Sequence, residues 1–207
     1  MRTRMKGVVF DVYGTIAEIR DPQRPFKQLF NLMREADSFL PDDSSAYLMS
    51  HPLDLKQAAQ RFNFAIGDEA LSRLNQALER ELRSITLFAD TIPVLTQLQQ
   101  AGFKLGICSN LAAPYAAPIE QLLPFRMDAN GWSFEVGAVK PDPAIYLHVC
   151  RQLGLQPEQV LMIGDTLDAD VLGPRTIGMR SIQIVRDLTR PCDEGLRSLT
   201  EFLELLQ

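Results

Sequence analysis

The chain has 207 residues and a formal net charge of −5, and 46% of its residues are hydrophobic. This length suits one large domain or a core with an inserted subdomain, and the hydrophobic content is that of a globular protein. The acidic balance argues against a nucleic-acid partner or a membrane surface, and no apolar run is long enough for a transmembrane helix. The three cysteines, at 108, 150 and 192, lack metal-like spacing, so we expect free thiols in a cytoplasmic protein.

The first predicted strand ends in a carboxylate. Val8, Val9 and Phe10 form a short apolar run that favours β structure, and Asp11 follows directly. Gly14 then allows a sharp turn. Ligands of open α/β sheets bind outside the carboxyl ends of the strands, so Asp11 is a candidate catalytic group. An aspartate that only ends a strand and caps the next segment is the alternative.

A helical block without a convincing strand is predicted for residues 16–86. Apolar residues recur at helical spacing in three groups: 26–33, 53–62 and 71–85. Asp68 is placed to cap the third helix, and residues 40–45 form a predicted loop.

The rest of the chain alternates between helix and strand. Strands are predicted at 103–108, within 125–134, at 160–163 and at 181–185. Alternation of this kind implies a parallel sheet with right-handed crossovers. We therefore predict an α/β protein with a Rossmann-like parallel sheet and helices on both of its faces. Residues 1–15 and 87–207 form this core, and residues 16–86 form an inserted all-helical cap.

Polar residues stand at four places that a parallel sheet would bring to one edge. They are Asp11, Ser109 with Asn110, Lys140, and Asp165 with Asp170. The three aspartates against one lysine leave about two unbalanced negative charges, and clustered carboxylates repel strongly at low dielectric. Either one carboxyl is protonated or a cation is bound. We favour the cation, and hard oxygen ligands without a His and Cys cluster suit Mg²⁺.

Four motifs resemble those of the haloacid dehalogenase-like hydrolase superfamily, in members with a helical cap after the first strand. They are FDVYGT at 10–15, ICSN at 107–110, KPDPAIY at 140–146 and IGDTLDAD at 163–170. The resemblance covers nearly the whole chain. It implies that Asp11 is a nucleophile, that Ser109 hydrogen-bonds the transferred group, and that Lys140 neutralises charge on nucleophile and substrate.

The resemblance also implies a magnesium ion and its ligands. The expected ligands are Asp11, the backbone carbonyl of Tyr13, Asp165 and Asp170. We assign Thr15 and Asn110 to substrate binding. A carboxylate nucleophile forms a covalent intermediate, and phosphoryl transfer needs a divalent ion and a lysine to neutralise the phosphoryl oxygens.

Tyr13 departs from the phosphatase pattern of this family. Phosphatases usually carry a second aspartate there as general acid/base, and a phenol with a pKa of about 10 is a poor replacement. The Asp-x-Tyr-Gly-Thr form resembles the family's 2-haloacid dehalogenases, whose halide leaves without a proton. Those enzymes, however, work without metal and lack the Gly-Asp pair found here at 164–165.

Three functions remain open. The favoured one is a magnesium-dependent hydrolase of a small anionic, phosphorylated metabolite that acts through an aspartyl intermediate at Asp11. The second is a metal-independent 2-haloacid dehalogenase. The third is a weakly active or inactive member that binds a ligand or partner. The chain is expected to be a monomer or a homodimer.

Overall fold

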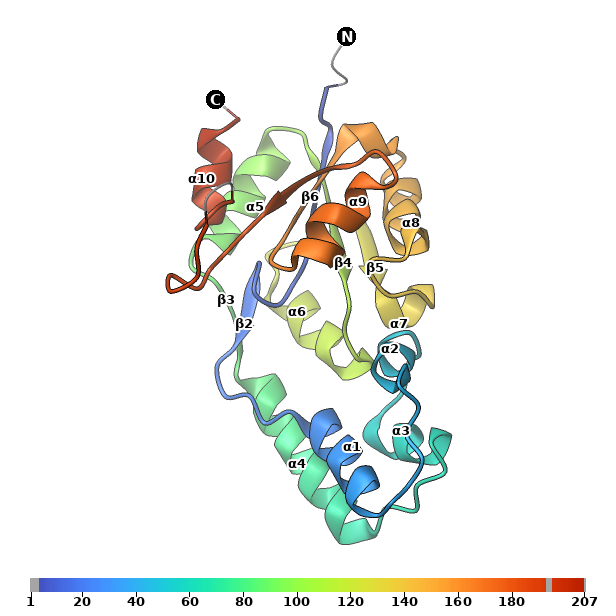
Figure 1. Ribbon diagram of the computed structural model, residues 1–207. Coiled ribbons are helices and arrows are strands. Elements are labelled where there is room, and N and C mark those ends of the chain that lie inside the picture. The colour runs from blue at the N-terminus through green and yellow to red at the C-terminus, as the bar shows by residue number, and fades with distance from the viewer. Residues whose placement is uncertain (1–3, 193–194, 207) are drawn as a thin grey trace.

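The computed structural model describes residues 4–192 and 195–206, and its centre is a parallel sheet of five strands (Figure 1). The strand order is β5-β4-β1-β6-β7. Strand β1 lies in the middle, and its four residues are apolar or small and all buried, which suits a strand covered on both faces. The bounds are β1 Gly7–Phe10, β4 Lys104–Ser109, β5 Ala129–Trp132, β6 Val160–Gly164 and β7 Arg180–Gln183.

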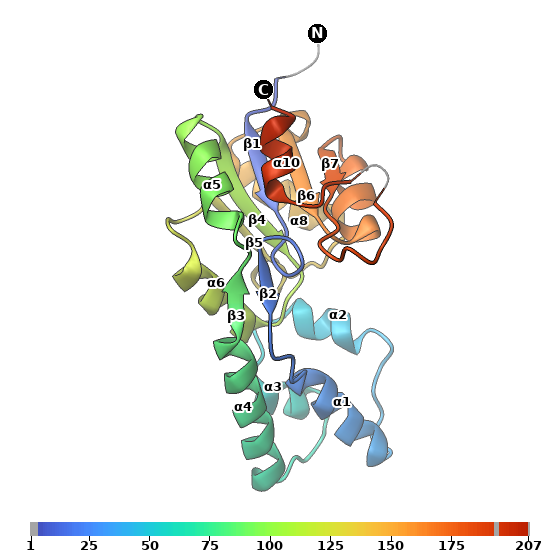
Figure 2. The ribbon, with the colours of Figure 1, turned by 90° about the vertical axis from the view of Figure 1, so that its left-hand side faces the viewer.

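Helices cover both faces of this sheet, as predicted. Alternate side chains of β1 point to opposite faces: Val8 and Phe10 belong to one hydrophobic cluster and Val9 to the other. Helices α5 (Thr91–Gln100) and α10 (Leu199–Glu204) pack on the first face, and α8 (Pro143–Leu153) packs on the second (Figure 2). The predicted Rossmann-like α/β core is therefore confirmed.

A group of four helices lies beyond the carboxyl edge of the sheet, in the lower part of Figure 1. They are α1 Pro25–Glu35, α2 Ser44–Met49, α3 Leu55–Arg61 and α4 Asp68–Arg83. We call α1–α4 the helical unit. Apolar residues of α1 and α3 at helical spacing, such as Leu29, Met33 and Ala58, are fully buried within it.

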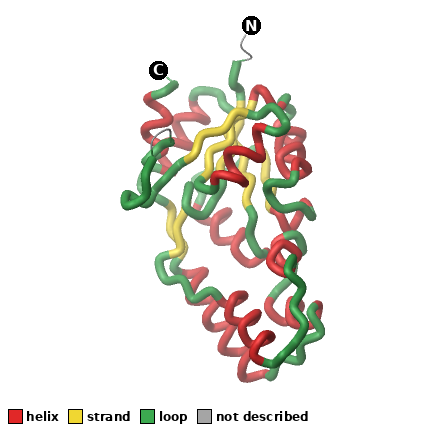
Figure 3. The backbone as a smooth tube through the Cα atoms, in the orientation of Figure 1, coloured by secondary structure: helices red, strands yellow, loops and turns green. Residues whose placement is uncertain are grey.

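The prediction that residues 16–86 contain no strand is wrong. Strands β2 (Ala17–Ile19) and β3 (Ile85–Leu87) pair antiparallel and join the helical unit to the sheet, as the yellow segments of Figure 3 show. Three-residue strands are too short for an alternating pattern to be recognised. We call β2–β3 the linking ribbon.

Two details of the helical unit also differ from expectation. The predicted loop at 40–45 runs into helix α2, which begins at Ser44. Gly67 is the N-cap of α4, and Asp68 is its first helical residue, where its charge favours the helix N-terminus.

The other predicted helices and strands agree with the structure within a few residues. Asp142 caps α8 by accepting a hydrogen bond from Ala144 N at 2.8 Å, and Gly154 ends that helix with φ 65°. The other elements are η1 Ala113–Tyr115, α6 Ala116–Leu122, α7 Ser133–Val136, η2 Pro157–Gln159, the π-helical turn η3 Leu167–Leu172, and α9 Gly173–Arg175. Among the described residues, no helix has the length and apolar character needed to cross a membrane.

Candidate active site

Asp11 stands at the carboxyl edge of the sheet, where β1 ends in a tight turn. Its backbone N–H donates to Ile163 O at 2.9 Å, which extends the pairing of β1 with β6. The carbonyl of Val12 then accepts bonds from Ile16 N at 2.9 Å and Ala17 N at 3.0 Å. Asp11 is 7% exposed, so it lies almost completely buried at this edge of the sheet.

Lys140 joins two of the predicted aspartates. Its Nζ lies 2.7 Å from Asp11 Oδ1 and 2.6 Å from Asp170 Oδ1, and its side chain is 2% exposed. Burial alone lowers the pKa of Lys140, but the carboxylates of Asp11 and Asp170 outweigh burial and raise this pKa above its ordinary value. Lys140 is therefore a fixed positive charge beside Asp11.

The turn after β6 fixes the position of Asp170. Thr166 N donates to Asp170 Oδ2 at 2.9 Å, and Tyr146 OH donates to Ala169 O at 2.5 Å. Gly164 is needed here because a Cβ at this position would lie 2.3 Å from the carboxyl carbon of Asp170. Burial raises the pKa of Asp170 to about 6, and the negative charge of Asp11 also raises it.

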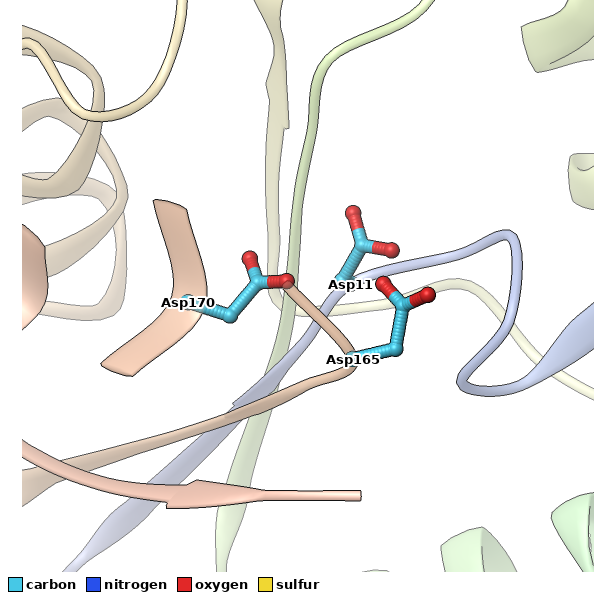
Figure 4. A group of neighbouring side chains, drawn as sticks. All are labelled: Asp11, Asp165 and Asp170. Carbon is cyan, nitrogen blue, oxygen red and sulfur yellow. The ribbon is translucent and has the colours of Figure 1, made fainter. Parts of the chain in front are cut away.

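Asp165 completes a cluster of three carboxylates, which Figure 4 shows. One oxygen from each of Asp11, Asp165 and Asp170 lies within 4.8 Å of the other two. Burial, followed by the charge of Asp11, raises the pKa of Asp165. Three carboxylates against one ammonium leave an excess of negative charge among hard oxygen donors, and this donor set fits Mg²⁺.

Gly14 allows the turn after Asp11 to approach Asp165. Its φ is 85°, and a Cβ there would lie 2.5 Å from Asp165 Oδ2. Only glycine satisfies both the backbone conformation and this close approach. The structure thus brings the first and fourth predicted motifs into direct contact.

The second motif contributes Ser109 and Asn110. Ser109 ends β4 and is 2% exposed. Asn110 Nδ2 donates to Lys140 O at 2.9 Å, and Lys140 N donates to Asn110 Oδ1 at 2.7 Å. The Asn110 amide therefore holds the backbone of Lys140 on both sides, while the Lys140–Pro141 peptide is cis.

Thr15 is fully buried, and its hydroxyl has no hydrogen-bond partner among the described residues. Its carbonyl accepts two bonds from Arg186, a residue that sequence reasoning did not single out. Arg186 belongs to none of the four motifs, and its hydrogen-bond partner is far away in the sequence, so no sequence pattern indicates its contact with Thr15.

The environment of the Tyr13 side chain does not suit proton transfer. Its hydroxyl donates to Tyr115 O at 3.0 Å, and the two rings meet edge to face. Burial, and then the charges of Glu81 and Asp11, raise the pKa of Tyr13 well above that of an ordinary phenol. Tyr115 OH in turn donates to Glu81 Oε1 at 2.6 Å, which links the core to α4.

A cavity of about 490 Å³ lies between the helical unit and the segment that follows β4. Tyr115 and Ala112 line it from the core, and Glu81 lines it from α4. Three basic residues also line it: Arg24, Lys27 and Arg34. Within residues 4–192 and 195–206, the side chains of Arg24 and Lys27 make no ion pair.

Comparison with known proteins identifies the family of the chain. Residues 5–178 match the family described as haloacid dehalogenase-like hydrolase. A glyceraldehyde 3-phosphate phosphatase of Methanothermobacter thermautotrophicus is 31% identical over 89% of this chain and 88% of its own length. An N-acetylmuramic acid 6-phosphate phosphatase of Pseudomonas aeruginosa is 29% identical over 93% of this chain and 87% of its own.

Solved structures that resemble this chain include members of the same family. A phosphatase of this family from Thermococcus onnurineus superposes with a TM-score of 0.67 at 28% identity and covers 98% of both chains. Similar proteins also include 2-haloacid dehalogenases. The chain belongs to the haloacid dehalogenase-like hydrolases, and it is an enzyme of the hydrolase class.

Proposed function

We propose that this hydrolase cleaves a small phosphate monoester through a covalent intermediate on Asp11 and that it depends on Mg²⁺. The observation that carries the proposal is the carboxylate cluster around Asp11, which Lys140 neutralises only in part. Relatives of two different phosphatase names, each matched over most of the chain, support the reaction class.

The chemistry follows from the position of Asp11. Its carboxylate oxygen attacks phosphorus, and the bond from phosphorus to the leaving-group oxygen breaks. Water then hydrolyses the aspartyl phosphate and releases inorganic phosphate. Lys140 stabilises the charge on the phosphoryl oxygens, and the Ser109 hydroxyl donates a hydrogen bond to one of them. Asn110 was predicted to bind substrate, but here it acts by holding the Lys140 backbone, because both polar atoms of its amide are hydrogen-bonded there. Thr15 was also predicted to bind substrate, but it is fully buried, so we assign it to the turn after Asp11.

The proposed ligands of Mg²⁺ are Asp11, the Tyr13 carbonyl, Asp165 and Asp170. The bound ion supplies charge neutralisation to the phosphoryl oxygens. The side-chain donors are already gathered within 4.8 Å, and an excess of about two negative charges favours a divalent cation over a bare site.

The helical unit is proposed to act as a cap that covers the carboxyl edge of the sheet and selects the substrate. The basic residues Arg24, Lys27 and Arg34 line the cavity between the helical unit and the core. Their positive charge favours a substrate with a second anionic group. Covering the site also excludes bulk solvent during attack on phosphorus. The domain limits proposed above fall at the linking ribbon.

A dehalogenase is the second candidate, because Tyr13 matches the dehalogenase form of the first motif. The two reactions differ in product and in metal dependence. Purified protein should be assayed for phosphate release from a panel of phosphate monoesters, and for chloride release from 2-chloropropionate, each with Mg²⁺ and with EDTA. Phosphate release that EDTA abolishes supports the proposal. Chloride release that EDTA leaves unchanged overturns it in favour of the dehalogenase.

A further inference from the structure

Arg186 connects three segments at the point where the helical unit leaves the core. It lies after β7, outside the residues that match the family. Its Nε and Nη2 donate to Thr15 O at 3.2 and 2.6 Å, and its Nη1 lies 2.7 Å from Asp90 Oδ2. The guanidinium also stacks on the Phe88 ring, 4.2 Å from its centroid.

These partners belong to the two chain segments that lead into and out of the linking ribbon. Thr15 lies in the turn between Asp11 and β2, and Asp90 lies between β3 and α5. The same segments meet at Ile16 O, which accepts from Phe88 N at 3.1 Å and from Thr91 Oγ1 at 2.7 Å.

The arrangement is largely buried, and a third segment of the chain also contacts it. The side chains of Arg186 and Asp90 are 15% and 13% exposed. Asp90 Oδ2 also accepts from Leu199 N at 2.7 Å, at the start of α10. Ion pairs at this depth are screened less by solvent than surface pairs, and one planar guanidinium reaches both acceptors, which a lysine ammonium cannot do in the same geometry.

We infer that Arg186 is a positioning residue for turnover: it clamps together the two chain segments at the core end of the linking ribbon, and thereby sets the turn that follows Asp11 and the position of the helical unit over the site. The kinetic part of this inference rests on the proposed hydrolysis at Asp11. The structural part does not depend on it.

The test compares Arg186→Met and Arg186→Lys with the control Arg175→Met. Arg175 also donates to a backbone carbonyl and a hydroxyl, both of Ser181, but it does not contact the ribbon segments. Hydrogen exchange of the backbone amides in β2 and β3 reports the clamp without any turnover, with the amides of β1 and β6 as internal reference. Initial rates on p-nitrophenyl phosphate, well below the melting temperature of each variant, give kcat and KM separately.

We expect amide exchange in the ribbon to accelerate at least tenfold in Arg186→Met, with β1 and β6 unchanged. We expect kcat to fall by about tenfold to hundredfold, because small displacements of a catalytic group are costly, and KM to change little. The kcat of Arg186→Lys should lie between those of Arg186→Met and the wild type. A third variant, Arg186→Ala, removes most of the side chain, and guanidinium ion added to it should restore part of kcat.

Unchanged ribbon exchange in Arg186→Met overturns the clamp. Faster ribbon exchange with unchanged kcat overturns the positioning role and leaves a structural one. A decrease in kcat of the same size in Arg175→Met also overturns it. Absence of turnover in the wild-type protein contradicts the proposed function instead, and the exchange measurement then still decides whether the clamp exists.

Discussion

Tyr13 stands where the phosphatases that this chain resembles carry a general acid/base, and its environment does not suit that role. Its hydroxyl donates to Tyr115 O, and burial raises its pKa above that of an ordinary phenol, which already lies well above neutrality. A leaving group therefore departs without a proton from Tyr13. We expect hydrolysis rates to depend steeply on the acidity of the leaving alcohol, with aryl phosphates much faster than alkyl phosphates.

Tyr13→Phe tests this reading directly. The variant keeps the ring contact with Tyr115 and loses one hydrogen bond, so unfolding should become easier by about 1 kcal/mol in urea titrations. Turnover of p-nitrophenyl phosphate should stay within about threefold, since no proton transfer is lost. A decrease of about 10² or more would show that the phenol takes part in the reaction. Tyr146→Phe serves as a comparison, because it also loses one tyrosine hydrogen bond, to Ala169 O beside Asp170, and should raise the Mg²⁺ concentration needed for activity.

The raised pKa values of Asp165 and Asp170 predict how pH and Mg²⁺ together affect the stability of the folded state. Their pKa values lie above the ordinary value near 3.8, and that of Asp170 is about 6. In metal-free protein the folded state therefore binds more protons than the unfolded state at pH values between the ordinary pKa and the raised pKa of each group. The stability of the folded state falls as pH rises through this window.

Magnesium should reverse this loss, because it binds the ionised carboxylates. We expect the rise in melting temperature on adding Mg²⁺ to be larger at about pH 7.5 than at about pH 5. Thermal unfolding followed by circular dichroism at both pH values checks this. An equal rise at both, or the same rise in an Asp165→Asn, Asp170→Asn double variant, would contradict a metal site at this cluster.

At the scale of elements, the turn after β1 is built so that the first and fourth motifs touch. Gly14 and Gly102 both have positive φ, 85° and 81°, but only Gly14 faces a carboxylate. Alanine at either position should cost about 1 kcal/mol of unfolding free energy from backbone strain. Gly14→Ala should also displace Asp165 and abolish most phosphate release, whereas Gly102→Ala should retain it. Comparable activity in the two variants would mean that the Asp165 position is not critical.

The elements also show what sequence reasoning could reach. Strands β1, β4 and β6 are short apolar runs with a polar residue at the end, and helix α8 begins with Pro-Asp-Pro, so the core and the edge that carries Asp11 were predictable. The linking ribbon and α2 were not, because three-residue strands and a six-residue helix contain too few residues for a periodic signal.

Within the site, the predictable residues were those that carry charge in a motif. Asp11, Lys140 and Asp170 meet as the parallel sheet implies. The sequence could not indicate that the side-chain amide of Asn110 makes hydrogen bonds to both the N–H and the carbonyl of Lys140. Nor could it indicate that Arg186 reaches across 171 positions to Thr15, because tertiary packing alone decides those contacts.

At the scale of the whole molecule, the charge of the cavity between helical unit and core predicts substrate preference. Arg24→Met with Lys27→Met should raise KM at least tenfold for phosphate monoesters that carry a carboxylate. KM for p-nitrophenyl phosphate, which has no second anion, should stay nearly constant. Arg73→Met, on the same helical unit but paired with Glu69 on the surface, is the control and should change neither value. An equal rise in KM for both substrate types would contradict a role in recognising a second anion.

Hydrolysis of p-nitrophenyl phosphate by wild-type protein and by Asp11→Asn, each with Mg²⁺ and with EDTA, tests whether Asp11 is the nucleophile of a metal-dependent enzyme. Nitrophenolate leaves without protonation, so the assay does not depend on an acid at Tyr13. We predict turnover by the wild type only with Mg²⁺, and a loss of at least about 10³-fold in Asp11→Asn, because the amide cannot act as the nucleophile. Turnover that survives either EDTA or the Asn substitution would contradict a metal-dependent aspartyl mechanism at Asp11.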